Sequence, residues 1–498
     1  MTNILVFPIL LPFASAAFCL LLWRKPEIQQ AVSLIGSASH LAAGILVLNR
    51  VVDTGIQVIF VGNWPAPFGI SLVADHLSAL MLTITGILSM SAAVYARGEL
   101  SGLLRRNGFH PLFHMLVGGL SGAFLTGDLF NLYVWFEVML MASFGLLVWG
   151  QTRPQMDGAV KYVVINLFAT LMFLMGLALL YGLTGTLNMA HLNQQIMTCE
   201  YKGLLTAVAF IFMVAFGIKA GMFPLFFWLP ASYHTPPVAI SALFAGMLTK
   251  VGVYALIRTF SLVFHHDMDT THGILLVLAA MTMVTGVLGA AAQNQFRRIL
   301  SFHIISQVGY MVLGLALWTP LALTGTIFYL IHHMIVKANL FFVSGLSRDL
   351  AGTMNLEEMG GIYRDKPFVA ILFFIPAFSL AGFPPLSGFW AKLLIIKSCL
   401  SVQSYIAAAV AVAVGLMTVF SMVKIWIEAF WKPLPPHVSK KPTTALSAWK
   451  IAPVCCLVLL TLCIGIGAEP VYELAQTAAG ELMNPQAYIE AVLQRVEK

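Results

Sequence analysis

Apolar runs long enough to cross a lipid bilayer fill most of this chain of 498 residues. A transmembrane helix needs about 20 predominantly apolar residues. Fourteen runs of roughly that length can be traced, at residues 3–23, 28–50, 71–97, 110–126, 129–150, 159–182, 203–229, 235–260, 272–293, 299–318, 321–346, 367–397, 403–431 and 450–468. With 59% hydrophobic and 9% charged residues, the chain is predicted to be an all-α polytopic membrane protein with about 14 transmembrane helices.

The segments between these runs predict little further structure. The first run has no basic residues before it, so we interpret it as a helix that stays in the protein and not as a cleaved signal. Residues 52–70 alternate in polarity and predict a short extracellular β-hairpin. Residues 183–202 are polar and predict a loop with a surface helix.

Lysine and arginine placement predicts the orientation, because inside loops of membrane proteins are rich in both residues. If the N-terminus is outside, sixteen basic residues fall in inside loops: Arg24, Lys25, Arg97, Arg105, Arg106, Arg153, Lys161, Arg297, Arg298, Arg348, Arg364, Lys366, Lys432, Lys440, Lys441 and Lys450. Six fall outside: Arg50, Lys202, Arg258, Lys397, Arg495 and Lys498. Both termini are therefore predicted to face out.

Two apolar runs contain the same glycine and proline interruption. Residues 220–225 read AGMFPL and residues 381–386 read AGFPPL, with Ala, Gly, Pro and Leu at equal offsets. Paired interruptions of this kind are typical of transporters built from two related repeats, although chance similarity between membrane helices is the alternative. A lysine accompanies each interruption, Lys219 before the first and Lys392 after the second.

Lys219 and Glu137 form the first candidate site. An ionisable side chain at bilayer depth is costly and is retained mostly where it has a function. A lone buried carboxyl would be neutral, whereas a nearby ammonium favours its charged form. We therefore expect Glu137 and Lys219 to be partners in proton exchange, with a static salt bridge between two helices as the alternative.

Further residues extend this candidate site. Lys250 lies midway along its apolar run, and burial would make it a group that takes up and releases a proton; snorkelling to the surface is the alternative. His333 and Lys337 are four residues apart and share one helix face, whereas His332 is expected to point elsewhere. A histidine is more often a structural group, but one beside a buried lysine fits a proton relay. Lys392 would exchange with the outer side or with a neighbouring subunit.

Other polar residues receive structural interpretations. Lys424 and Glu428 predict a surface pair, and Asp75 and Asp128 predict helix caps. Histidines near helix ends are expected to be structural: His76, His110, His114, His234 and His303. The six cysteines lack zinc or disulfide spacing, and nucleotide, haem and iron–sulfur motifs are missing from the sequence, so no cofactor, metal or nucleic acid is expected. Buried lysines repel cations, which favours a proton path over a sodium site.

Long stretches resemble the antiporter-like membrane subunits shared by respiratory complex I and the Mrp multisubunit cation/proton antiporters. They include residues 71–82, 128–147, 215–258, 332–345 and 381–392. The resemblance implies two inverted five-helix repeats and discontinuous helices 7 and 12. Residues 1–109 would hold helices 1–3 and the hairpin, 110–260 the first repeat, 261–432 the second, and 433–498 a cytoplasmic loop, helix 14 and the tail.

By motif position, the resemblance also implies a proton relay along the membrane midplane. Its members would be Glu137, Lys219, Lys250, His333, Lys337 and Lys392. It further implies a prokaryotic plasma-membrane location in a hetero-oligomeric complex, with sodium handled by other membrane subunits. A proton-pumping subunit of complex I or of a related membrane hydrogenase is the alternative, and a structural scaffold is a third.

Overall fold

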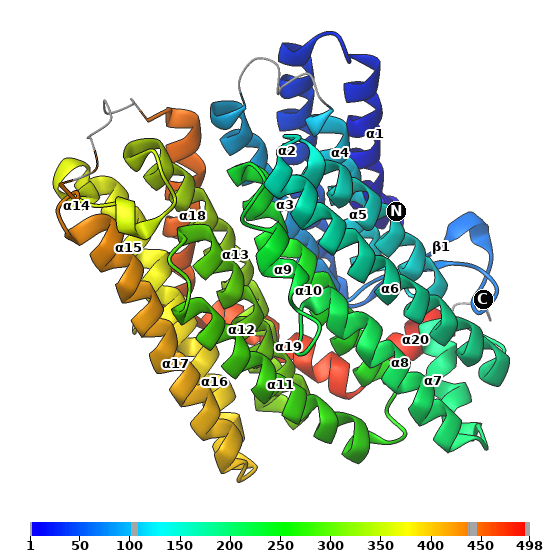
Figure 1. Cartoon of the computed structure of the whole chain (residues 1–498). Helices are drawn as coiled ribbons and strands as arrows, with labels where there is room; N and C mark the ends of the chain where they lie inside the picture. Colours follow the sequence, from blue (N-terminus) through cyan, green and yellow to red (C-terminus); the bar gives the residue numbers. More distant parts are fainter. Residues whose placement is uncertain (1, 101–107, 437, 439–445, 494–498) are drawn as a thin grey trace.

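A computed structural model describes residues 2–100, 108–436, 438 and 446–493 of the chain. This part is a bundle of helices (Figure 1), of which twelve are long and apolar enough to cross a membrane. Two shorter apolar helices, α4 (Phe109–Leu125) and α15 (Pro367–Ala381), belong to the same bundle. The prediction of a helical multi-pass membrane protein is therefore confirmed.

The N-terminal helices α1 (Phe7–Leu21), α2 (Pro26–Thr54) and α3 (His76–Glu99) pack beside α4. Between α2 and α3, strand β1 (Gln57–Phe60) pairs antiparallel with β2 (Ser71–Ala74), which confirms the hairpin. The predicted start of the third helix at residue 71 is wrong, because β2 occupies those residues. The helix begins only after Asp75, whose carboxylate accepts a hydrogen bond from the Ser78 amide at 2.9 Å.

The next elements are α5 (Leu129–Val148), α6 (Arg153–Thr184), α7 (Met189–Thr198), α8 (Lys202–Ala220), α9 (Trp228–Ser232) and α10 (Val238–Leu262). Asp128 caps α5 through the Asn131 amide at 2.8 Å, as predicted, and so separates α4 from α5. The predicted surface helix within 183–202 is α7.

The second half contains α11 (Met268–Ala291), α12 (Phe296–Leu317), α13 (Pro320–Ala351), α14 (Ile362–Asp365), α15, α16 (Ser387–Ser401), α17 (Tyr405–Ile425) and α18 (Ala448–Ile466). The hydrophobic stretches of α10 and α13 are 94% and 100% buried, against 39% for α6, α11 and α17. Helices α10 and α13 therefore form the centre of the bundle, where polar side chains are shielded from lipid.

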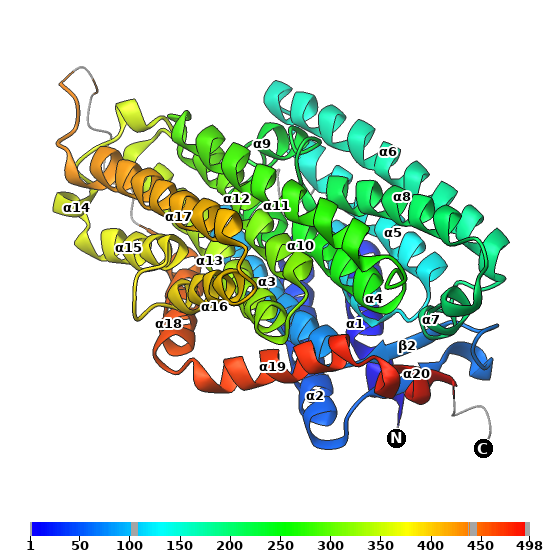
Figure 2. The same cartoon turned by 90° about the horizontal axis from the view of Figure 1, so that it is seen from below.

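Two further helices follow the last apolar run. Helix α19 (Glu469–Met483) packs against α3, α10 and α13, and α20 (Gln486–Leu493) packs against α7 and β1. Figure 2 shows α19 and α20 running across one end of the bundle. The prediction of a plain tail was incomplete, because small apolar residues spaced among charged ones give α19 one buried face. We call this end the α19 side, and the opposite end, where α3 finishes, the Glu99 side.

Two predictions about charged residues are wrong. Arg258 does not lie in an outside loop: it is buried in α10 and pairs with Asp75 at 2.6 Å. Lys424 does not pair with Glu428 but donates to the carbonyls of Ala291 and Gln293, and Glu428 pairs with Lys432 instead. Six of the basic residues used to predict orientation lie outside the described residues: Arg105, Arg106, Lys440, Lys441, Arg495 and Lys498.

Candidate functional site

Both glycine and proline interruptions end a helix in the same way. Helix α8 stops at Ala220 and α15 at Ala381, and the glycine that follows each has a positive φ, 78° at Gly221 and 97° at Gly382. Such a backbone favours glycine, which explains its place in both interruptions. The chain resumes as α9 after the first interruption and as α16 after the second.

Lys219 lies in the last turn of α8 and is 6% exposed. Its Nζ donates to Thr170 Oγ1 on α6 at 3.0 Å and lies 4.9 Å from the centre of the Phe136 ring. Glu137 is on α5 beside Phe136, near enough for its charge to act on Lys219. The two form no direct ion pair in the described structure, and Glu137 Oε1 has no hydrogen-bond partner there. They are neighbours that interact through space, not a salt bridge.

Lys250 is fully buried in the middle of α10. Its Nζ donates to the Ala245 carbonyl of the same helix at 2.5 Å, and its charge acts on Lys337 and His333 of α13. Two residues further on, Gly252 lies against the backbone of Lys219 and Ala220: a Cβ there would be 2.5 Å from the Ala220 nitrogen. The helices that carry Lys219 and Lys250 therefore touch backbone to backbone.

His333 and Lys337 face the centre of the bundle from α13, and neither is exposed. Lys337 Nζ donates to the Leu300 carbonyl of α12 at 3.0 Å. Neither ring nitrogen of His333 has a hydrogen-bond partner among the described residues. An unpartnered buried imidazole is costly in a static structure, but it can accept and pass on a proton.

The sequence interpretation missed two histidines. His303 is predicted near a helix end, yet it is fully buried in α12, where the charges of Lys337 and Lys392 act on it. His332 points away from the face of Lys337, as predicted, but it reaches the second interruption, where its Nδ1 is 2.8 Å from Ser387 Oγ at the start of α16. The signal available for His303 was its place seven residues inside an apolar helix.

Lys392 lies on α16, beyond the second interruption, and is 6% exposed. Its Nζ reaches back across the interruption and donates to the Ala381 carbonyl at 3.0 Å. It also lies 5.4 Å from the centre of the Tyr310 ring. The charge of Lys392 acts on His332 of α13 and on His303 of α12, and the charge of Lys337 acts on the same two histidines.

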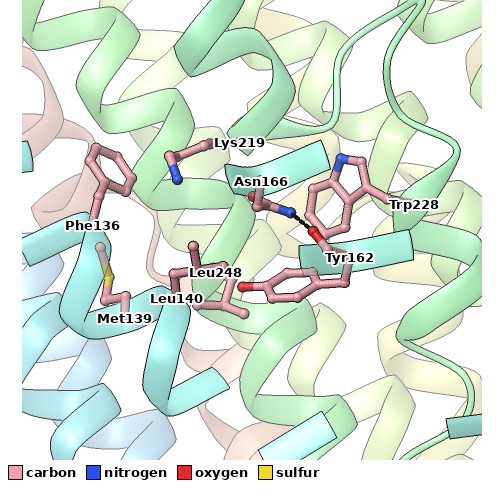
Figure 3. Close-up of a pocket in the computed structure, with 8 residues that line it drawn as sticks. All are labelled: Phe136, Met139, Leu140, Tyr162, Asn166, Lys219, Trp228 and Leu248. Carbon is pink, nitrogen blue, oxygen red and sulfur yellow. Dashed lines mark hydrogen bonds between the residues drawn. The ribbon is translucent and has the colours of Figure 1, made fainter. Parts of the chain in front are cut away.

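A small cavity adjoins Lys219 (Figure 3). It has a volume of about 20 Å³ and is lined by Phe136, Met139, Leu140, Tyr162, Asn166, Lys219, Trp228 and Leu248. A site of that size holds about one water molecule. A water there would reach the lysine ammonium together with polar groups of Tyr162 and Asn166.

Polar residues on one face of α6 connect this cavity to the Glu99 side. They follow a helical spacing of seven, four and four: Gln155, Tyr162, Asn166 and Thr170. Tyr162 Oη is 2.6 Å from Ser143 Oγ, and the Thr170 hydroxyl accepts the Lys219 hydrogen bond. Gln155 lines a second cavity of about 290 Å³, together with Glu99, Arg297 and Arg348. The row of polar groups therefore runs from a large cavity with charged residues in its lining to Lys219.

The comparisons with known proteins identify the family of the chain. The family model described as NADH:quinone oxidoreductase/Mrp antiporter, TM matches residues 126–418. The chain belongs to this family of antiporter-like membrane subunits. It is a membrane subunit of the multisubunit antiporter type, similar along its whole length to the D subunits of Na(+)/H(+) antiporters.

Two curated relatives and one solved structure illustrate the similarity. The D subunit of the Na(+)/H(+) antiporter of Alkalihalophilus pseudofirmus is 46% identical over 99% of this chain and 100% of the relative. The D subunit of the Bacillus subtilis antiporter is 39% identical over 99% of this chain and 100% of the relative. A chain of the Mrp complex from Dietzia sp. DQ12-45-1b superimposes with a TM-score of 0.90 at 34% identity, covering 99% of both chains.

Proposed function

We propose that this chain carries protons in a multisubunit Na⁺/H⁺ antiporter of a prokaryotic plasma membrane. The observation that carries the proposal is the series of titratable groups from Glu137 to Lys392 on neighbouring helices, all of them buried except Glu137, which is half-buried. Its members are Glu137, Lys219, Lys250, His333, Lys337 and Lys392, and we add His303 and His332. We call this series the midplane row.

Protons would pass along the midplane row as a sequence of coupled titrations. Lys250 and Lys337 repel each other when both are charged, so a proton that arrives at one favours release from the other. His333 and His303 have ring nitrogens without fixed hydrogen bonds among the described residues, which leaves them free to relay a proton between the lysines. Transfer between residues that are not in contact would use water, for which the cavity beside Lys219 offers a place.

Access to the midplane row would differ at its two ends. The large cavity on the Glu99 side and the polar face of α6 support access from that side to Lys219. Lys392, held across the second interruption, would exchange with the opposite side or with a neighbouring subunit. The basic loops support an assignment of the Glu99 side to the cytoplasm and of both termini to the outside.

The finer architecture is part of the same proposal. Residues 110–260 and 261–432 would form two inverted five-helix repeats within a chain of about fourteen spans. Helix 7 would comprise α8 and α9, and helix 12 would comprise α15 and α16. Matching interruptions after Ala220 and Ala381 support this division.

Sodium would cross elsewhere in the assembly. The row holds one carboxylate against four lysines, so a dehydrated sodium ion would meet repulsion and few oxygen ligands. The Dietzia relative was solved as part of a complex, and other membrane subunits are the expected partners here.

The test is sodium-dependent proton efflux from vesicles that contain the whole assembly, with Lys250→Ala compared with wild type at equal expression. We expect exchange to fall to background. Lys161→Ala is the matched control, because Lys161 is half exposed and pairs with Asp157 at the surface. If Lys250→Ala exchanges sodium for protons as fast as the wild type, Lys250 is not part of the path and the proposal loses its central residue.

A further inference from the structure

A group of buried histidines and serines lies outside the midplane row, between α2 and α4. Helix α2 contributes Ser33, Ser37 and His40, and α4 contributes His110, His114 and Ser121. None of the six is more than 3% exposed. We call them the histidine–serine column.

Two hydrogen bonds of the same kind join the helices. His114 Nε2 is 3.0 Å from Ser33 Oγ, and His40 Nε2 is 2.8 Å from Ser121 Oγ. In the first pair α4 supplies the histidine, and in the second α2 supplies it. Both pairs are 81 residues apart in sequence, so the two helices run parallel in one register and the pairs lie two turns apart.

Ser37 lies between the two pairs. It follows Ser33 by one turn and precedes His40 by one turn, so it shares their face of α2. Its hydroxyl has no hydrogen-bond partner in the described structure, and neither does Nδ1 of His40 or of His114. His114 is close enough to His40 and to His110 for their charges to interact. Ser37 and the free nitrogens of both histidines therefore have no fixed hydrogen bonds in the described structure, and a histidine can carry a proton between its two nitrogens.

The column covers much of the bundle's thickness. His110 lies in the first turn of α4 on the Glu99 side, and Ser121 lies about 16 Å further along the helix axis at about 1.5 Å per residue. Thr126, at the α19 end of α4, accepts a hydrogen bond from the Asn131 side chain at 3.0 Å and continues the polar groups toward that side. A membrane protein rarely places three histidines among lipid-spanning helices without a function for them.

We propose that the histidine–serine column is a second proton route, separate from the midplane row, between the Glu99 side and the α19 side. Ser37 is its central link. Each histidine takes up a proton on one ring nitrogen and releases one from the other, which leaves the ring neutral but in its other tautomer. A ring flip or a tautomer exchange then restores the starting state before the next transfer. Glu137 and the lysines of the midplane row take no part in it.

Ser37→Ala gives the sharpest test, because the Ser37 hydroxyl has no hydrogen-bond partner among the described residues. A structural role predicts no loss, since deletion of an unpartnered buried hydroxyl is neutral or stabilising. The parent for this comparison is the assembled complex carrying Lys250→Ala, a substitution that interrupts the midplane row. Vesicles containing it receive an imposed membrane potential without sodium, and an internal pH dye reports proton flux.

We expect proton flux in the Lys250→Ala vesicles to fall about tenfold or more when Ser37→Ala is added, and to recover with Ser37→Thr. His40→Gln, which keeps a hydrogen bond to Ser121 but does not titrate, is expected to match Ser37→Ala. Ser421→Ala is the control, because the Ser421 hydroxyl is on α17 and donates to the Met417 carbonyl of its own helix.

Unreduced flux in both Ser37→Ala and His40→Gln, or the absence of flux in the Lys250→Ala parent, would overturn the second route. The proposed function fails separately, if Lys250→Ala leaves sodium-dependent exchange intact. The two results are distinguishable because the Ser37 comparison is made without sodium.

Discussion

Arg258 and Asp75 form a buried bidentate ion pair, with Nη1 to Oδ2 at 2.6 Å and Nη2 to Oδ1 at 2.9 Å. Arg258 comes from α10, the helix of Lys250, and Asp75 caps α3. The pair therefore fixes the α19 end of a central helix against the N-terminal part of the bundle.

Asp75→Asn should destabilise the protein strongly. Asparagine can still cap α3, but it leaves the Arg258 charge buried without a partner, which costs about 3–5 kcal/mol. The measurement is thermal unfolding of the purified assembly. Asp157→Asn removes one partner of an exposed pair and should cost about 1 kcal/mol or less. Equal shifts for the two variants would contradict a stabilising role for the Arg258 pair.

Gly252→Ala should slow sodium–proton exchange, because it displaces Lys219. The added methyl group would meet the Ala220 nitrogen at 2.5 Å, so α8 and α10 must separate. Overpacking of this kind costs about 1–3 kcal/mol. Gly203→Ala, at an open site in the first turn of α8, is the control. Sodium-dependent proton efflux at equal expression is the measurement, and similar rates in both variants would show that the close approach is dispensable.

Thr170→Val should slow exchange while leaving the shape of α6 intact. The substitution removes the acceptor of the Lys219 hydrogen bond, and a hydrogen bond to a charged group contributes about 1.5–3 kcal/mol, which corresponds to roughly 10- to 100-fold in rate. Thr184→Val on the same helix loses bonds to backbone carbonyls alone and serves as the control. Exchange that is equally fast in both variants would mean that Thr170 does not orient Lys219.

His234, in the loop between α9 and α10, should make stability depend on pH. Burial and then the charge of Arg297 lower the pKa of His234 from 6.5 to about 4. The unfolded chain therefore binds the proton first as pH falls, so its contribution to stability is complete above pH 6.5 and is lost between 6.5 and about 4. The loss is at most about 3 kcal/mol. The unfolding temperature of His234→Gln should fall less than that of the wild type as the pH is lowered from 6.5 to about 4. An equal fall in variant and wild type would contradict this prediction.

The helices could be predicted because long apolar runs admit few other structures in a membrane. Lys219, Lys250 and Lys337 stood out for the same reason, since a charge in such a run is rare. The sequence could not show that Arg258 lies inside the bundle, because its partner Asp75 is 183 residues away. His303 was missed because its surroundings come from α13 and α16, which are distant in sequence.

The relation between Glu137 and Lys219 shows a further limit. The sequence pairs the two residues, and they are close enough to interact, but no direct salt bridge forms, because the Lys219 ammonium turns to Thr170 on a third helix. Sequence patterns identify which side chains are costly to bury. They do not identify which of several acceptors a flexible lysine selects.

Helix α19 is fastened to the start of α3 by Glu481, which accepts from the His76 amide at 3.0 Å and lies 2.7 Å from His76 Nδ1. The same helix packs on α13, so it acts as a strap across the N-terminal and C-terminal halves. A transport mechanism in which one half of the bundle rotates against the other would have to break the contacts of α19 in every cycle. The strap therefore suits a stationary scaffold, in which ions advance by rotamer changes and shifting hydration while the backbone stays in place.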